Sequence, residues 1–381
     1  MTIQETYMKR AIALAELGRG HTSPNPMVGC VIVKDGRIIS EGYHERCGEY
    51  HAERNALLRC TEDPSGADLY VTLEPCCHYG RTPPCTEIII EKKIGRVFVG
   101  SLDCNPQVAG KGVSILREHG IEVTCGILEE ECLRLNEVFY HYMTTKTPFV
   151  VAKYAMTLDG KIACESGDAK WVSGEAAREE VHLLRKYYSG IMAGIGTVLA
   201  DDPMLNCRIE AGVDPVRIIC DSKMRIPVES RIVQTAAEIP TILAVSARIE
   251  APEKEAILRK AGVEILRVST SDAQGEKTAV DLKELMRLLG ERGIDSILLE
   301  GGGTLNAAAF RAGIVNKVQA YIAGKIIGGA QAPTPVRGIG ADCMEQAVRL
   351  SDLQVSMVGE DIRVIGYPKA RNRKEETCLQ D

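Results

Sequence analysis

Strand-like and helix-like segments alternate along the first half of the chain. Apolar runs at residues 28–33, 69–73 and 97–100 are typical of strands, whereas residues 52–60 and 86–93 have the spacing of helices. Strands that alternate with helices form a sheet that the helices cover. The first half is therefore predicted to be an α/β layer structure.

The same alternation restarts in the second half, after a helix-like segment at residues 129–143 and a polar stretch at residues 144–147. Strand-like runs follow at residues 149–155, 216–220, 241–245, 264–268 and 296–299. They contain few polar residues, which predicts burial on both faces. The 381 residues also exceed the length at which a single core stops growing, about 250–300 residues. We predict two α/β domains, over residues 1–145 and 146–368, and a flexible tail at residues 369–381.

Charge and hydropathy restrict the class of function. The net charge of −6 lacks the basic excess that nucleic acid binding requires. The N-terminal segment begins with a capping box at Thr2 and Glu5 and lacks the long apolar run of a signal peptide. We expect a cytoplasmic protein that binds neither nucleic acid nor membranes. Its 14 cysteines are expected to stay reduced.

Three potential zinc ligands, His51, Cys76 and Cys85, stand out in the first half, within the motifs H-A-E and P-C. One imidazole and two thiolates leave the fourth tetrahedral position of zinc to water, as in catalytic sites. Zinc lowers the pKa of such a water, which can then act as a nucleophile near neutral pH. Glu53 is predicted to move protons between this water and the leaving amine, which is the pattern of zinc nucleobase deaminases.

The long loop between the two cysteine ligands is specific. Residues 74–85 read E-P-C-C-H-Y-G-R-T-P-P-C, and together with H-A-E they resemble the bifunctional deaminase/reductases of riboflavin biosynthesis. The segments at residues 24–30 and 105–112 resemble the same family. Two departures, Cys77 for a frequent serine and Cys104 for a common proline, do not touch the proposed ligands. The resemblance implies a cytidine-deaminase-like three-layer α/β/α domain, with a pyrimidine pocket lined by Asn25, His44, His78 and Asn105.

In the second half, G-G-G-T-L-N at residues 301–306 follows the strand-like run 296–299 and precedes a helix-like segment. Glycines at such a point let the backbone approach a phosphate, although a tight turn has nearly the same pattern. The segments at residues 153–161, 167–171 and 196–203 resemble the reductase half of the same family. The resemblance implies a dihydrofolate-reductase-like α/β domain.

The resemblance also implies the site residues of this half. NADPH is expected to contact Ala155, Trp171, Thr197, Asp201, Ser222, Gly302, Gly303, Thr304, Leu305 and Asn306. The substrate is expected to contact Lys153, Arg185, Leu205, Arg208 and Glu300, and the guanidinium groups suit its phosphate. Ala169 replaces a serine that commonly contacts the substrate and is left out of the site. Lys153 and Asp201 are candidates for polarising the sugar or donating a proton.

The implied reaction has two steps. The first domain, with one Zn²⁺, would deaminate 2,5-diamino-6-ribosylamino-4(3H)-pyrimidinone 5′-phosphate. The second domain would then reduce the ribosyl group with NADPH, giving 5-amino-6-ribitylamino-uracil 5′-phosphate. A small phosphorylated pyrimidine is thus the expected partner, and the family resemblance favours a homo-oligomer.

Three other interpretations are possible for the zinc motif. A structural zinc would need a fourth protein ligand, for which Cys77 and His78 are the local candidates. A nucleic-acid-editing deaminase shares the zinc motif, but the acidic charge, the long loop and the second domain argue against it. A non-catalytic sensor of flavin intermediates is also possible, but such a protein has no need of a proton shuttle like Glu53.

Overall fold

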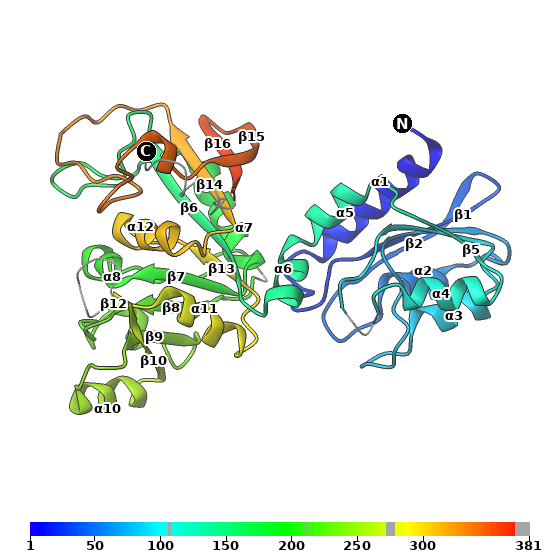
Figure 1. Cartoon of the computed structure of the whole chain (residues 1–381), viewed down its shortest axis with the longest axis horizontal. Coiled ribbons are helices and arrows are strands. Elements are labelled where there is room, and N and C mark those ends of the chain that lie inside the picture. The colour runs from blue at the N-terminus through cyan, green and yellow to red at the C-terminus, as the bar shows by residue number, and fades with distance from the viewer. Residues whose placement is uncertain (106–107, 211, 272–278, 370–381) are drawn as a thin grey trace, which may run out of the picture. The chain divides into compact units, whose positions relative to one another are not determined.

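A computed structural model describes residues 1–105, 108–210, 212–271 and 279–369 of the chain. It divides into two compact units, Met1–Thr147 and Pro148–Asp381 (Figure 1). Both units are α/β structures, as predicted. Of the predicted tail, residues 370–381 lie outside the described part of the chain.

The first unit is built on a five-stranded sheet in the order β2-β1-β3-β4-β5. β1 (Gly29–Lys34) pairs antiparallel with β2 (Arg37–Tyr43) and with β3 (Asp68–Leu73). β3 then pairs parallel with β4 (Arg96–Ser101), and β4 with β5 (Glu122–Cys125). The sheet is therefore mixed, with its parallel strands on one side.

Helices cover both faces of this sheet, as Figure 1 shows. α2 (Ala52–Arg59), α3 (Cys85–Glu91) and α4 (Lys111–Glu118) pack against one face. α1 (Ile3–Ala15) and α5 (Glu129–Leu135) pack against the other face. The unit is thus a three-layer α/β/α structure, as the family resemblance implied.

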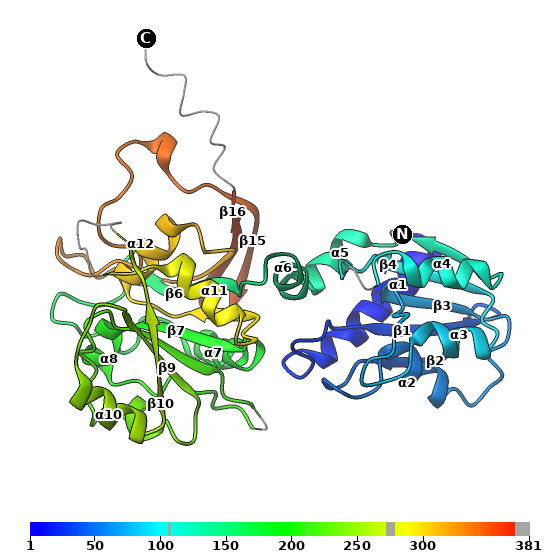
Figure 2. The same cartoon turned by 60° about the horizontal axis from the view of Figure 1, so that its bottom comes forward.

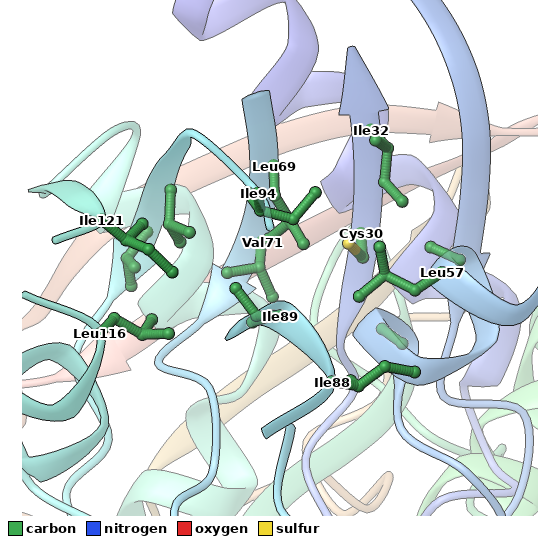
Figure 3. Close-up of a cluster of buried hydrophobic side chains, with 14 of the residues drawn as sticks. Cys30, Ile32, Leu57, Leu69, Val71, Ile88, Ile89, Ile94, Leu116 and Ile121 are labelled. Carbon is green, nitrogen blue, oxygen red and sulfur yellow. The ribbon is translucent and has the colours of Figure 1, made fainter. Parts of the chain in front are cut away.

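Alternate residues of the strands supply two separate cores. Cys30 of β1 points to the cluster under α2, α3 and α4 (Figure 3), whereas Val31 belongs to the cluster under α1 and α5. In the second cluster the rings of Tyr70 and Phe98 stack with centroids 4.5 Å apart. Because successive side chains of a strand point to opposite faces, a sheet covered on both faces needs continuous apolar runs.

The prediction of a single helix over residues 129–143 was wrong. α5 ends at Leu135, and α6 (Glu137–Thr145) begins after Asn136. The Asn136 side chain accepts a hydrogen bond from the Met27 N–H at 2.8 Å and donates one to the Met27 carbonyl at 2.9 Å. Asn136, at the break between the two helices, therefore fixes the backbone at Met27, which is 109 residues away in the sequence.

The second unit contains a nine-stranded sheet in the order β10-β9-β8-β7-β13-β6-β14-β16-β15. Its parallel strands are β6 (Phe149–Thr157), β7 (Gly190–Gly194), β8 (Val216–Cys220), β9 (Thr241–Ser246), β10 (Val263–Val268), β13 (Ser296–Leu299) and β14 (Lys317–Ala323). β15 (Leu350–Val358) and β16 (Asp361–Pro368) add an antiparallel edge, drawn in red in Figure 2. β11 (Thr270–Ser271) and β12 (Ala279–Val280) form a separate short ladder.

The helices of this unit also lie on both faces of its sheet. α11 (Leu282–Gly290) and α12 (Gly303–Ala312) share one buried cluster with the strands. The other helices are α7 (Glu175–Tyr187), α8 (Ile195–Asp201), α9 (Arg231–Gln234) and α10 (Pro252–Lys260), of which α8, α9 and α10 contribute to the opposite cluster. The predicted burial on both faces holds for β8, β9 and β13 but fails at β10, an edge strand that exposes Glu264 and Arg267. The opposite edge strand, β15, exposes Leu353, Val355 and Met357.

Short 3-10 turns at Glu16–Gly18 and Met344–Gln346 complete the described elements. The capping box predicted at Thr2 and Glu5 is present at the start of α1. The described cysteines are all free thiols. Among the helices of the described residues, none has the length and apolar character needed to cross a bilayer.

Candidate active sites

The three predicted zinc ligands come from the starts of two helices and from the loop between them. His51 is the N-cap of α2, Cys85 is the first residue of α3, and Cys76 follows β3. The ligand atoms all lie within 4.8 Å of one another. The Sγ atoms of Cys76 and Cys85 lie 3.4 and 3.6 Å from His51 Nδ1. These separations suit one tetrahedral ion with bonds of about 2.0–2.3 Å.

The chemistry of the two thiols also fits a divalent cation. The Cys85 thiol and His51 stabilise the thiolate of Cys76 and lower its pKa to about 4, against the effect of burial. The hydrogen bond to Cys76 and burial raise the pKa of Cys85. Without a metal ion, Cys76 and Cys85 together therefore favour a single thiolate. A divalent cation bound between the two sulfur atoms favours deprotonation of both. In the described part of the chain the cluster contains neither Cys77 nor His78, so it offers three protein ligands.

Glu53 lies in the first turn of α2, beside these ligands. The residue is 3% exposed, and its Oε2 atom has no hydrogen-bond partner among the described residues. Burial raises the pKa of Glu53 to about 7, and the neighbouring Cys76 thiolate adds to the rise. A carboxyl group with a pKa near neutrality can both accept and return a proton.

A cavity of about 350 Å³ opens onto Glu53 and onto two of the ligands, His51 and Cys76. It is lined by all four residues predicted to contact the pyrimidine, Asn25, His44, His78 and Asn105. Asn25 Nδ2 lies 3.2 Å from His44 Nε2, and His44 Nδ1 lies 3.1 Å from the carbonyl oxygen of Tyr50. Burial lowers the pKa of His44, which favours a neutral imidazole in the cavity wall.

Most of the predicted reductase residues lie near the carboxyl ends of four parallel strands, which is where open α/β sheets bind ligands. They belong to β6 (Lys153, Ala155), to α8 after β7 (Thr197, Asp201), to the loop after β8 (Ser222), and to the segment after β13 (Glu300, Gly302, Gly303, Thr304, Leu305, Asn306). The residues are far apart in the sequence. The sheet topology brings them to one edge.

Lys153, Arg185 and Glu300 form a largely buried cluster of charges, with side chains 13% exposed. Arg185 of α7 donates two hydrogen bonds to the Glu300 carboxylate, at 2.9 and 3.0 Å, and Lys153 Nζ lies 4.0 Å from it. Burial alone would raise the pKa of Glu300, but Arg185 and Lys153 outweigh it and lower the pKa to about 2. Burial lowers the pKa of Lys153, and Glu300 opposes this change.

The glycine loop leads directly into α12. Gly302 is the N-cap of α12. A Cβ at Gly303 would lie only 2.4 Å from the Arg337 side chain, so a larger residue at this position would clash. A Cβ at Gly302 would lie 3.5 Å from the hydroxyl of Thr197. The first N–H groups of a helix have no intrahelical partner and favour an anion. Asn306 Oδ1 is buried without a partner among the described residues, which leaves an acceptor for a ligand. This arrangement fits the diphosphate and ribose of a dinucleotide.

The predicted residues of the second unit differ in exposure and in their contacts. Trp171 is 61% exposed and therefore does not anchor the core. Asp201 and Arg208 are exposed, whereas Leu205 is buried. The Ser222 hydroxyl accepts a hydrogen bond from the Val280 N–H at 3.2 Å. No hydrogen bond or ion pair between described residues joins Trp171, Asp201 or Ser222 to the Lys153 cluster.

Known proteins resemble the whole chain. The family model of the RibD C-terminal domain matches residues 148–364, and that of the cytidine and deoxycytidylate deaminase zinc-binding region matches residues 1–101. The riboflavin biosynthesis protein RibD of Actinobacillus pleuropneumoniae is 54% identical over 357 residues, which are 93% of each chain. The chain belongs to the RibD family. RibD of Bacillus amyloliquefaciens is 41% identical over 368 residues, 96% of this chain and 97% of that one.

Solved structures of RibD proteins have the same fold. RibD of Acinetobacter baumannii matches with a TM-score of 0.83 and 37% identity over 97% of this chain and 99% of that one. A deaminase/reductase of Thermotoga maritima, described as acting on diaminohydroxyphosphoribosylaminopyrimidine and 5-amino-6-(5-phosphoribosylamino)uracil, matches with a TM-score of 0.83 and 40% identity over 96% and 99%. RibD proteins are deaminases and reductases, so this chain is an enzyme of riboflavin biosynthesis with both activities. Its deaminase unit binds zinc, and its reductase unit uses a nicotinamide cofactor.

Two carboxylates near the deaminase site were not singled out from the sequence of this RibD chain. Glu74 accepts hydrogen bonds from the N–H groups of Asp103, Gly110 and Val113, at 3.3, 2.8 and 3.1 Å. Asp103 lines the cavity, and burial raises its pKa. The position of Glu74, directly after a buried strand and before P-C, was the available signal. Glu74 ties the loop that carries Asn105 to the loop that carries Cys76.

Proposed function

We propose that the chain catalyses two consecutive steps. The first is deamination of 2,5-diamino-6-ribosylamino-4(3H)-pyrimidinone 5′-phosphate. The second is NADPH-dependent reduction of the ribosyl side chain, which gives 5-amino-6-ribitylamino-uracil 5′-phosphate. The observation that supports the proposal is the carboxyl group of Glu53 in the cavity that His51 and Cys76 also line, in a chain that matches RibD proteins over nearly its full length.

In the first unit, His51, Cys76 and Cys85 would hold Zn²⁺, which supplies a nucleophilic water at neutral pH when bound. The free Oε2 of Glu53 would accept one proton of this water and pass it to the ring nitrogen, and would then carry the second proton of the water to the leaving amine. The walls of the cavity, Asn25, His44, His78 and Asn105, would orient the pyrimidine. The hydrogen bond between Asn25 and His44 fixes the orientation of both side chains before substrate binds.

In the second unit, the start of α12 at Gly302, Gly303, Thr304, Leu305 and Asn306 would hold the diphosphate of NADPH, which supplies the hydride. Ala155, Trp171, Thr197, Asp201 and Ser222 complete the proposed cofactor site. Lys153, Arg185, Leu205, Arg208 and Glu300 form the proposed substrate site. Of the two candidate proton donors, burial beside Glu300 favours Lys153, because Asp201 is exposed.

The proposal includes the finer expectations about cofactor, partner and location. NADPH would be preferred to NADH, and the partner would be a small phosphorylated pyrimidine. The protein would act in the cytoplasm as a homo-oligomer.

A mass-resolved assay tests both steps. The zinc-loaded protein is incubated with the diaminopyrimidinone ribosyl phosphate, with and without NADPH. Deamination should occur without NADPH, and a gain of two hydrogens should follow when NADPH is added. Absence of any change in the substrate would refute the proposal.

A further inference from the structure

Helix α7 carries a histidine that the sequence motifs did not single out. His182 lies three residues before Arg185 and four after Arg178, so the three side chains share one face of the helix. The guanidinium of Arg178 lies over the Trp171 ring, 4.7 Å from its centroid, and Arg185 bonds to Glu300. Both ends of this face therefore contact residues of the proposed reductase site.

The segment before Arg208 is held against the same turn of α7. Arg185 Nη1 donates a hydrogen bond to the Asn206 carbonyl at 3.0 Å, and the Cys207 thiol donates one to the His182 carbonyl at 3.6 Å. Arg208 follows directly in the sequence. These contacts hold the backbone next to Arg208 against the turn of α7 that carries His182.

Four charged groups act on the His182 imidazole. Burial lowers the pKa of His182 most, the cations Arg185, Arg208 and Lys153 lower it further, and Glu300 opposes them. These four residues are the charged members of the proposed substrate site. The imidazole is therefore part of the same electrostatic environment and is favoured in its neutral form.

One ring nitrogen of His182 makes no hydrogen bond within the described part of the chain. His182 Nδ1 is buried and has no hydrogen-bond partner among the described residues. Buried polar atoms without partners are rare in folded proteins, and each one calls for an explanation. A buried N–H without an acceptor is costlier than a buried lone pair, so the neutral imidazole is assigned its proton at Nε2, which is then a donor.

The charges around His182 favour an anion. Lys153, Arg185 and Arg208 supply three cations against the single carboxylate of Glu300. Arg185 and Lys153 already face Glu300, whereas Arg208 is exposed and forms no ion pair within the described ranges. One guanidinium and one imidazole N–H therefore remain for an anionic group of the substrate.

We propose that His182 is a further substrate contact of the reductase and donates a hydrogen bond from Nε2 to the 5′-phosphate, beside Arg208. The inference rests on the function proposed for the second unit. A phosphate uses both the charge of Arg208 and the N–H of His182, because its oxygens accept several charge-assisted hydrogen bonds. A ribose hydroxyl would use only the N–H.

The test compares the deaminated substrate with the same compound lacking its phosphate. His182→Phe keeps a ring at this position and removes the donor. Its kcat/KM for the phosphorylated substrate should fall about tenfold or more, mainly through KM, as for a lost hydrogen bond to a charged group. For the dephosphorylated compound kcat/KM should match the wild-type value.

Two further variants make the test specific. His182→Gln offers an amide N–H and should recover part of the loss on the phosphorylated substrate. Lys186→Gln removes a positive charge from the same helix and should leave both substrates unaffected. The KM for NADPH reports whether the second unit is folded, and it should stay unchanged in all three variants.

Equal losses of His182→Phe on both substrates would overturn the inference, as would an unchanged KM for the phosphorylated one. If His182→Phe lost NADPH binding, the test would use His182→Gln instead. The kcat/KM of that variant must then fall for the phosphorylated substrate and stay unchanged for the dephosphorylated one. Failure of the wild-type protein to reduce either compound would instead refute the function proposed for the second unit, and this inference with it.

Discussion

Replacement of Glu53 by glutamine tests the deaminase mechanism most directly. Glutamine has nearly the same size as glutamate but cannot accept a proton. Glu53 is 3% exposed, so bulk water cannot take over the role of its carboxylate. Glu53→Gln should keep the zinc site of His51, Cys76 and Cys85 and lose deamination.

The expected loss follows from the number of proton transfers. The carboxyl group of Glu53 takes a proton from water and later delivers one to the substrate, and its unpartnered Oε2 is the atom available for both. General acid–base catalysis contributes about 10²–10⁴-fold to a rate. Because one group serves two transfers, kcat should fall by about 10⁴-fold, or about 5.4 kcal/mol in activation free energy.

The assay measures ammonia release together with the zinc content of the purified protein. Reduction of the deaminated intermediate by the same chain is the internal control, because Glu53 lies in the other unit. Glu91→Gln, which changes an exposed glutamate of α3, is the matched control and should retain normal activity. Deamination by zinc-loaded Glu53→Gln within about tenfold of wild type would refute the proton-transfer role.

Three further predictions concern zinc binding, acid stability and loop position. Cys85→Ala should lower bound zinc well below one ion per chain and abolish deamination but not reduction, as metal analysis and both assays would show. Glu300→Gln should destabilise the second unit by about 3 kcal/mol at pH 7 in urea unfolding, because Arg185 and Lys153 lose their counter-charge. The folded-state pKa of Glu300, about 2, lies below its ordinary value of 4.5. Its stabilisation is therefore present above pH 4.5 and lost as pH falls toward 2, so the two proteins should converge there, and a constant difference would contradict the assignment. Asn136→Ala removes both hydrogen bonds to Met27 and should raise the KM of deamination at unchanged zinc content; an unchanged KM would contradict a positioning role.

Local patterns predicted most elements of the fold. Apolar runs such as residues 69–73 and 296–299 became β3 and β13, because strands buried on both faces carry this pattern regardless of their neighbours. Two predictions failed where a distant contact or an uncovered edge decides the outcome. Residues 129–143 kept a helical period but were divided at Asn136. β10, predicted to be buried on both faces, stands at an edge of its sheet and exposes Glu264 and Arg267.

The candidate sites show the same division. The residue types and spacing of His51, Glu53, Cys76 and Cys85 predicted a zinc site from the sequence alone, because one imidazole and two thiolates are ligands that zinc prefers. The structure alone revealed the hydrogen bonds of Glu74 to the loop that carries Asn105. No local pattern connects those two loops in the sequence.

The sequence by itself determined the α/β alternation, the zinc donor set and, through its motifs, the family. Only the tertiary structure decided which charges meet and which groups stay without partners. Arg185 and Glu300 are 115 residues apart in the chain, and Asn136 and Met27 are 109 apart. Periodicity reports how a side chain faces its own sheet or helix, and it contains no information about a partner at such a separation. The absence of a hydrogen-bond partner for His182 Nδ1 among the described residues is visible only in the tertiary structure, because it depends on which groups pack around α7.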